Sequence, residues 1–236
     1  MFLLALPSVF AGNQSSLFNN ATIIYHPSNN VSQDNSTYKA TASLTSDPLF
    51  DISTNSTDFD GDDYLAFSTI PAYTTMLNYS FFFWGNLTGN DRVNMIIGNN
   101  GAGVNGEFRF FYNDAGASNQ FTLTTFGGCE INFNYVTLAV TETNGYELYG
   151  FSVTKNSTTL NTGIIYINGT EVASGTCAAD RGILTTSEIH LASEGTAGVS
   201  SQRYIGVMKG VIFINTTRER NITTSNKRDK HEISGK

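Results

Sequence analysis

One stretch of this chain nearly dictates its own local structure. Residues 164–175 read Ile-Ile-Tyr-Ile-Asn-Gly-Thr-Glu-Val-Ala-Ser-Gly, with alternating apolar positions on both sides of Asn168-Gly169. A period of two is typical of a β-strand, and an Asn-Gly pair accepts the positive φ angles of a two-residue hairpin turn. The stretch therefore predicts a β-hairpin, and any fold for this chain must accommodate it.

Short β-branched and aromatic runs, separated by clusters of Asn, Gly, Ser and Asp, recur along the chain. The sequence has only four prolines and no long segment with helical periodicity. Eleven such runs in about 160 residues match the strand density of two packed antiparallel sheets. We therefore predict an all-β fold, an antiparallel two-sheet β-sandwich, with strands at 64–67, 79–85, 93–98, 107–112, 120–126, 132–140, 147–154, 163–168, 170–175, 188–192 and 204–215.

One of these predicted strands, at 79–85, has aromatic residues on both faces. Phe81 and Phe83 share one face, and Phe82 and Trp84 share the other, because side chains alternate along a strand. We expect this strand to be central, with its aromatic residues in the core.

Two further motifs resemble a known family. Phe59-Asp60-Gly61-Asp62-Asp63-Tyr64-Leu65 has the form F-D-G-x-x-Y-L, and residues 206–214 end in the form of a closing G-x-I-x-x-x-x-I strand. Together with the Tyr-x-Asn-Gly hairpin, they resemble laminin-G-like modules of the concanavalin A-like lectin/glucanase superfamily. The resemblance covers about residues 58–217 and implies a concanavalin A-like jelly roll.

The segments outside that range differ from it in composition. Residues 1–11 are an apolar run that ends in Val9-Phe10-Ala11, which predicts a signal segment cleaved before Gly12 or, alternatively, a retained N-terminal strand. Residues 12–57 form a polar lead-in whose short strands, near 21–25 and 37–43, we expect to pack on the edge of the sandwich. Residues 218–236 form a basic, flexible tail, either a solvated end or a docking arm or processing site.

The distribution of charge argues against two classes of partner. The net charge is −7, and the basic tail holds six of the thirteen Lys and Arg but only three of the twenty acidic residues. Residues 1–217 therefore have seven bases and seventeen acids, a net charge of −10. Such a body repels phosphates, which argues against nucleic acids and anionic membranes. The apolar run at 1–11 is too short to span a bilayer, so we expect no membrane span.

Glycosylation motifs and cysteines indicate a secreted or extracellular surface protein. The two cysteines, Cys129 and Cys177, are expected to form a disulfide that closes a loop of nearly fifty residues. Eleven Asn-x-Ser/Thr motifs mark candidate N-glycosylation sites: Asn13, Asn20, Asn30, Asn35, Asn55, Asn78, Asn86, Asn156, Asn168, Asn215 and Asn221.

The sequence gives little support for catalysis. The resemblance implies that an enzyme of this family would carry paired carboxylates as E-x-D-x-E on one strand, for retaining glycoside hydrolysis. The nearest match, residues 130–134, reads Glu-Ile-Asn-Phe-Asn and offers one carboxylate. There is no G-x-S-x-G motif. Of the three histidines, His26 and His231 lie in the polar ends, and His190 is expected on the surface beside Glu188. We therefore predict no enzyme and no cofactor, with the exception of calcium.

Calcium is the one ion that the sequence suggests. Asp58, Asp60 and Asp62, with Gly61, imitate the start of an EF-hand loop, but Thr69 stands where a bidentate Glu is needed. The family resemblance instead makes this segment a turn that enters a strand, although several laminin-G-like modules hold calcium at a rim. Asp58, Asp60 and Asp62 are therefore candidate calcium ligands.

Two functional hypotheses follow. The first is a non-enzymatic recognition or adhesion module that binds glycans or glycoproteins, with Tyr73, Tyr112, Tyr146 or Tyr204 able to stack on sugars. The second is a structural subunit of a filament, coat or virion surface that binds copies of itself by strand addition. A glycoside hydrolase is the weakest hypothesis.

Overall fold

The computed structural model describes residues 21–25, 36, 40–51, 53–54, 56–68, 78–87, 93–99, 108–113, 120–125, 129–134, 145–155, 161–177, 188–193 and 204–215. All regular secondary structure in these ranges is β-strand. Among these residues there is no helix long and apolar enough to cross a membrane.

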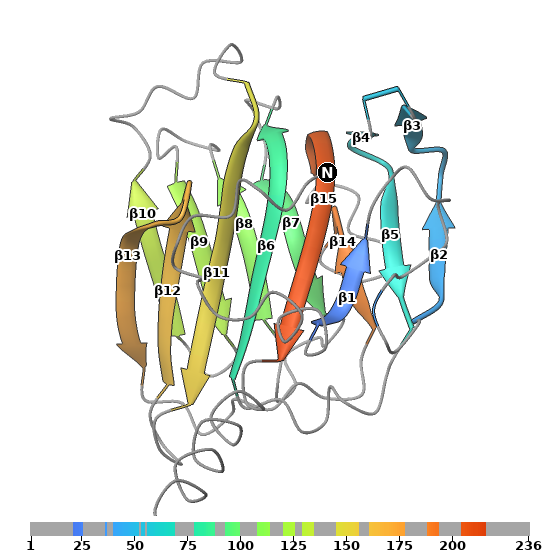
Figure 1. Ribbon diagram of the computed structural model, residues 1–236. Coiled ribbons are helices and arrows are strands. Elements are labelled where there is room, and N and C mark those ends of the chain that lie inside the picture. Colours follow the sequence, from blue (N-terminus) through green and yellow to red (C-terminus); the bar gives the residue numbers. More distant parts are fainter. Residues whose placement is uncertain are drawn as a thin grey trace, which may run out of the picture.

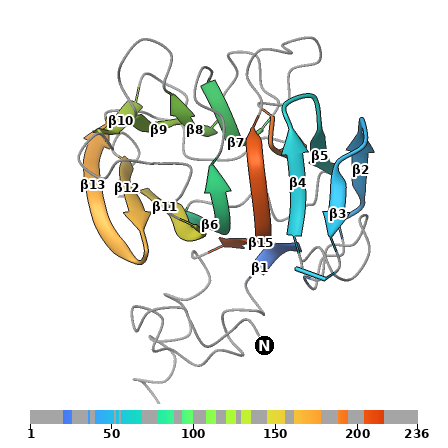
Figure 2. The same cartoon turned by 90° about the horizontal axis from the view of Figure 1, so that it is seen from above.

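The strands form two antiparallel sheets stacked face to face (Figures 1 and 2), which confirms the predicted β-sandwich. The eight-stranded sheet has the order β13-β12-β11-β6-β15-β4-β3, with β1 also paired to β15. Its strands are β1 (Ala21–Tyr25), β3 (Leu49–Asp51), β4 (Ser56–Asp60), β6 (Asn78–Leu87), β11 (Glu147–Lys155), β12 (Asn161–Ile167), β13 (Thr170–Cys177) and β15 (Ile205–Asn215).

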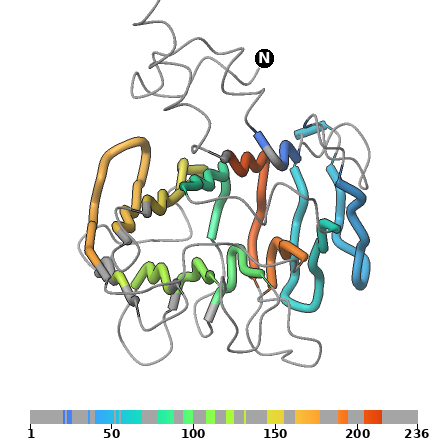
Figure 3. Tube along the Cα trace, turned by 90° about the horizontal axis from the view of Figure 1, so that it is seen from below, coloured from blue at the N-terminus to red at the C-terminus, as the bar shows by residue number. Residues whose placement is uncertain are grey.

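The second sheet has seven strands in the order β10-β9-β8-β7-β14-β5-β2. They are β2 (Ala42–Thr45), β5 (Tyr64–Phe67), β7 (Val93–Asn99), β8 (Phe108–Asn113), β9 (Gln120–Thr125), β10 (Cys129–Asn134) and β14 (Ile189–Leu191). Viewed from below, β12 and β13 lie at one end of the stacked sheets and β2 to β5 lie at the other end (Figure 3).

Aromatic side chains fill the space between the sheets. Phe108 of β8 stacks on Phe213 of β15 with ring centroids 5.8 Å apart, and Phe110 meets Phe151 of β11 at 5.3 Å. All four rings are fully buried. Aromatic pairs at such distances contribute about 0.5–1.5 kcal/mol each beyond the area that they bury. These contacts join strands that are distant in sequence, so they fix how one sheet lies on the other.

Strand β6 is central, as predicted: it pairs with β11 on one edge and with β15 on the other. Phe81 and Phe83 point into the core and are buried. On the opposite face Phe82 is buried, but Trp84 is only half-buried. The prediction that the aromatic residues of this strand are buried is therefore confirmed for Phe81, Phe82 and Phe83 and wrong for Trp84.

The predicted hairpin is confirmed as β12 and β13. Asn168 and Gly169 have φ angles of 51° and 79°, the positive values that this turn requires. The Asn168 side chain also ties the turn to β11: the Leu148 amide donates to Asn168 Oδ1 at 3.0 Å, and Asn168 Nδ2 donates to Glu147 Oε1 at 3.1 Å.

The lead-in takes part in both sheets. Strand β2 lies at a sheet edge and overlaps the strand expected near 37–43, although it begins only at Ala42. Strand β3, at the edge of the other sheet, was not predicted. Strand β1 does more, because Ala21, Ile23 and Tyr25 are almost fully buried. Tyr25 also shares a 2.7 Å buried hydrogen bond with Thr57 of β4.

The predicted strand at 132–140 differs from the structure. Strand β10 begins at Cys129, because Cys129 pairs with Thr125 of β9 and the ladder continues from there to Asn134. Residues 135–140 lie outside the described part of the chain. Ile131 of β10 packs over Gly163 and Gly175 of the other sheet, where glycines leave room for its side chain.

Candidate functional site

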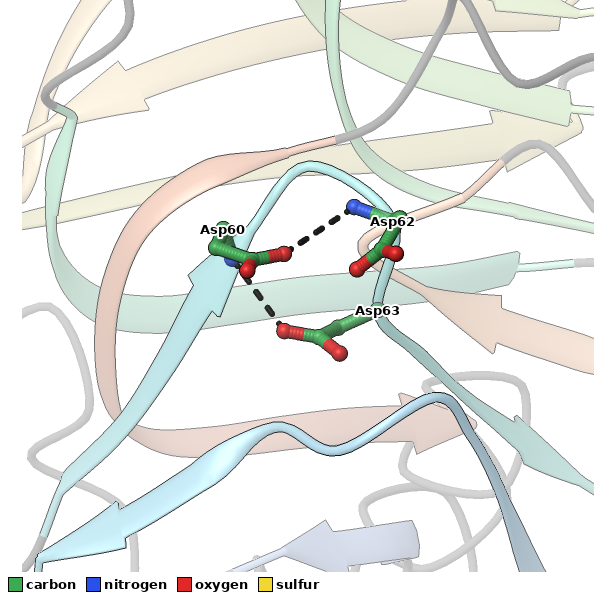
Figure 4. Close-up of side chains that lie close together, drawn as sticks. All are labelled: Asp60, Asp62 and Asp63. Carbon is green, nitrogen blue, oxygen red and sulfur yellow. Dashed lines mark hydrogen bonds between the residues drawn. The ribbon is translucent and has the colours of Figure 1, made fainter.

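The acidic motif forms the turn between β4 and β5 (Figure 4). The Asp62 amide donates to Asp60 Oδ1 at 3.2 Å, and the Asp60 amide donates to Asp63 Oδ2 at 3.2 Å. The Asp47 amide donates to Asp63 Oδ1 at 3.0 Å. Gly61 lies in the turn with a φ of 103°, which favours glycine. We call residues 60–63 the acidic turn.

The carboxyl groups of the acidic turn differ in environment. Asp63 is only 2% exposed, and burial raises the pKa of its carboxyl group. Asp60 is exposed, and hydrogen bonding to Asp62 lowers the pKa of its carboxyl group. A pair of carboxyl groups with opposite pKa shifts can act as acid and base. Here, however, both Asp63 oxygens accept backbone amides and are shielded from solvent, so this side chain closes the turn.

The carboxylates that the structure brings together differ from the predicted calcium-ligand set. Carboxylate oxygens of Asp60, Asp62 and Asp63 lie within 4.8 Å of one another, whereas Asp58 is not part of this group. Carboxylate oxygens are the ligands that Ca²⁺ prefers. Exposed acidic groups often gather without an ion, and the hydrogen bonds to Asp63 give this turn a structural reason to be acidic. Calcium binding stays a prediction.

His190 lies on the outer face of the seven-stranded sheet. As predicted, it shares that face with Glu188, and its Nε2 lies 3.3 Å from Glu188 Oε2. The expectation of a surface histidine is wrong, because His190 is only 4% exposed. It pairs with the small residues Ala66 and Gly98 on either side, and its ring stacks on Tyr64 at 5.4 Å.

The environment of His190 does not suit nucleophilic catalysis. Burial lowers the pKa of the imidazole, and the Glu188 carboxylate partly opposes that shift. The Nδ1 atom is buried without a hydrogen-bond partner, so the described residues provide no hydroxyl or thiol for it to activate. His26 and His231 lie outside the described residues.

The four tyrosines proposed as sugar contacts differ in where they lie. Tyr112 and Tyr204 are buried in the core, so they cannot stack on a ligand. The Tyr204 hydroxyl instead donates to the Asn86 carbonyl at 2.9 Å. Tyr73 lies outside the described residues. Tyr146 is half-buried, with the Lys209 ammonium 3.7 Å from the centroid of its ring. Among the three of these tyrosines that the structure describes, only Tyr146 is placed where it can contact a ligand.

The two cysteines lie at the same end of neighbouring strands. Cys129 begins β10 and Cys177 ends β13, and these strands run in opposite directions at the same side of the sandwich (Figure 1). Ile131 packs beside Gly175, so each cysteine is two residues from that contact along its strand. This backbone arrangement suits the predicted disulfide, which stays a prediction.

The structure places only some of the predicted glycosylation sites. Asn78 is 8% exposed, Asn86 is half-buried, and Asn168 is exposed on the hairpin turn. Asn215 is the last residue of β15. The remaining sites lie outside the described residues: Asn13, Asn20, Asn30, Asn35, Asn55, Asn156 and Asn221.

Comparison with known proteins supports the fold. No protein-family model and no curated protein matches the chain. Among solved structures, the binding domain of botulinum neurotoxin DC in complex with rat synaptotagmin II aligns with a TM-score of 0.63 at 15% identity. A botulinum neurotoxin serotype D ligand-binding domain in complex with N-acetylneuraminic acid aligns with a TM-score of 0.64 at 14% identity.

A third similar structure is domain 4 of AbnA, an extracellular arabinanase from Geobacillus stearothermophilus, in complex with arabinotriose. It has a TM-score of 0.59 at 13% identity, and the alignment covers 83% of this chain and 92% of that domain. The two neurotoxin alignments cover 89% and 90% of this chain but only 52% of theirs, so this chain spans about half of those structures. These likenesses show a shared β-sandwich fold, and the laminin-G-like assignment stays a prediction.

Proposed function

We propose that this chain is a non-enzymatic extracellular module that recognises glycans or glycoproteins. The observation that carries the proposal is the likeness to the arabinanase domain, which matches over 92% of its length and was solved with arabinotriose. The neurotoxin structure with N-acetylneuraminic acid adds support, although this chain corresponds to only about half of it. A shared fold alone does not determine function, so the ligand has to be established on this chain.

The side chains of the described residues support a binding role. Among the described residues, only the acidic turn brings three potential metal-binding side chains together. Its Asp63 carboxylate accepts hydrogen bonds from two backbone amides. His190 faces no nucleophile among the described residues. Secretion follows, as a proposal, from the apolar start and the eleven glycosylation motifs.

A glycan array tests the proposal directly. The purified chain is applied to an array that contains arabino-oligosaccharides, other neutral glycans and sialylated glycans. Reproducible binding to a defined subset, with no release of reducing sugar from those glycans, is the expected result. Binding to no glycan would refute recognition, and turnover of a bound glycan would refute the non-enzymatic part of the proposal.

One observation favours strand addition as a second candidate function. Strand β1 precedes all other described strands in the sequence, pairs with β15, and buries Ala21, Ile23 and Tyr25 in the core. A strand with this placement could be donated to a second copy of the chain. Size-exclusion chromatography with light scattering distinguishes the candidates, because open-ended high-mass species favour assembly and a monodisperse monomer argues against it.

A further inference from the structure

The outer face of the eight-stranded sheet is unusual for a solvent-facing surface. Antiparallel sheets commonly place polar side chains on the face away from the core. Here Phe82 and Trp84 of β6 lie on that face, since Phe81 and Phe83 point into the core. Trp84 is half-buried and lies on the central strand of the sheet. It is also the only tryptophan of the chain.

A β-bulge in β15 places a cation beside this surface. Met208 pairs with Gly85 and Gly210 pairs with Trp84, so Lys209 is the extra, unpaired residue between them. A bulge bends its strand and can redirect a side chain next to a functional site. The Lys209 ammonium lies 3.7 Å from the centroid of the Tyr146 ring, at a distance suited to a cation–π interaction.

Tyr146 belongs to the same part of the sheet. It directly precedes β11, whose first residue, Glu147, pairs with Gly85 of β6. The next residue along β11, Leu148, pairs with Trp84. Strands β11, β6 and β15 therefore bring Tyr146, Trp84 and Lys209 together from three distant parts of the sequence.

Polar groups border these residues. Val207 of β15 pairs with Asn86 on one side and with Asp58 on the other, which places Asn86 and Asp58 in one row across the sheet. Asp58 is exposed. Burial raises the pKa of the Tyr146 hydroxyl, and the charges of Asp58 and Asp51 raise it further.

We infer that Trp84, Tyr146, Lys209, Asn86 and Asp58 form a binding platform for a neutral glycan. The inference rests on the proposed function and names its site. A sugar ring has an apolar C–H face, which can cover the exposed part of the Trp84 indole, and hydroxyls at its edge. Those hydroxyls can accept from Lys209 and Asn86 and donate to Asp58. Lys209 offsets the charge of Asp58, and the Asp51 carboxylate adds a second negative charge near Tyr146, which disfavours an acidic sugar.

The single tryptophan makes the platform directly testable. Arabinotriose and the neutral glycans selected on the array are titrated into the full chain while Trp84 fluorescence is recorded. We expect a saturable change in emission with the same midpoint as glycan binding. The protein is produced in a host that lacks N-glycosylation, because a glycan attached at Asn86 would cover the same surface.

Substitutions provide the second measurement. We expect Trp84→Ala and Tyr146→Ala each to weaken glycan binding at least about tenfold, which corresponds to a loss of about 1.4 kcal/mol. Lys209→Ala should weaken it several-fold. Tyr64→Ala is the matched control, because Tyr64 is a half-buried aromatic residue on the outer face of the other sheet. It should bind as the unmodified chain does.

The outcomes separate the platform from the proposed function. If neutral glycans bind but Trp84 emission stays constant and Lys209→Ala binds normally, the platform is wrong while glycan recognition stands. Preference for sialylated over neutral glycans would overturn the ligand class that the platform predicts. If no glycan binds at all, the proposed function fails and the platform fails with it. If the Trp84→Ala variant does not fold, the fluorescence titration of the unmodified chain and glycan binding by the Lys209→Ala variant still test the platform.

Discussion

Three glycines in the eight-stranded sheet provide a graded test of the packing. A Cβ added at Gly150 would collide with the Phe82 ring and with the Phe81 carbonyl. One added at Gly163 would collide with the end of the Ile131 side chain, and one at Gly175 would lie 3.1 Å from Ile131 Cγ1. A backbone carbonyl in a ladder cannot yield, whereas the end of an isoleucine can rotate.

The expected losses follow from those obstacles. Overpacking of a core typically costs about 1–3 kcal/mol, and more where the surroundings cannot yield. We expect Gly150→Ala to cost about 3 kcal/mol or more, Gly163→Ala about 1–2 kcal/mol, and Gly175→Ala about 1 kcal/mol or less. Urea unfolding at equilibrium measures each change in the free energy of unfolding, with the slope of the transition checked for two-state behaviour.

A double-mutant cycle tests whether the collision with Ile131 causes the loss of stability expected for Gly163→Ala. Ile131→Ala alone should cost about 2–5 kcal/mol, since the side chain is buried. Combined with Gly163→Ala it should cost less than the sum, because the added methyl group then occupies the vacated space. Strict additivity, or a Gly150→Ala variant as stable as Gly175→Ala, would refute the packing described for this sheet.

Four further predictions concern single groups. Cys129→Ser or Cys177→Ser should lower the free energy of unfolding by up to about 4 kcal/mol, because the disulfide would close a loop of nearly fifty residues in the unfolded chain. Intact-mass measurement with and without reductant shows whether the disulfide exists. The pKa of His190 is lowered in the folded state. Below pH 6.5 the unfolded chain therefore binds a proton that the folded chain does not, so the free energy of unfolding should fall as the pH drops. Urea titrations of His190→Gln should show a smaller decline. Asp63→Ala should cost about 1–3 kcal/mol in thermal unfolding, because it removes the acceptor of two partly buried backbone amides. Calcium should bind the acidic turn with measurable heat at millimolar concentration, and calorimetry without such heat would dismiss the ion.

The sequence predicted those parts of the fold that local patterns encode. The Asn168-Gly169 turn was predictable because few residue pairs accept two positive φ angles. The central position of β6 followed from aromatic residues on both of its faces. The short β14 between β7 and β5, and the pairing of β1 with β15, depend on contacts between distant segments. No local pattern specifies those neighbours.

The candidate platform was mostly beyond the reach of sequence reasoning. Tyrosines at 112, 146 and 204 look alike in the sequence, yet Tyr112 and Tyr204 point into the core and Tyr146 does not. The direction of each depends on strand register, and a shift by one residue reverses it. One signal was available: Lys209-Gly210 interrupts an otherwise apolar strand, as a β-bulge often does.

The two faces of β6 separate stability from the proposed binding. Phe81 and Phe83 are fully buried and contact aromatic residues of neighbouring strands, so their truncation to Ala should cost about 3–5 kcal/mol. Trp84 lies on the same strand but is half-buried on the opposite face, so a smaller part of its area is removed from water on folding. The buried part of the indole still contributes to stability, and the exposed part leaves apolar surface that a ligand can cover. Trp84→Ala should therefore cost less stability than truncation of Phe81 or Phe83, while it weakens glycan binding at the outer face of the central strand.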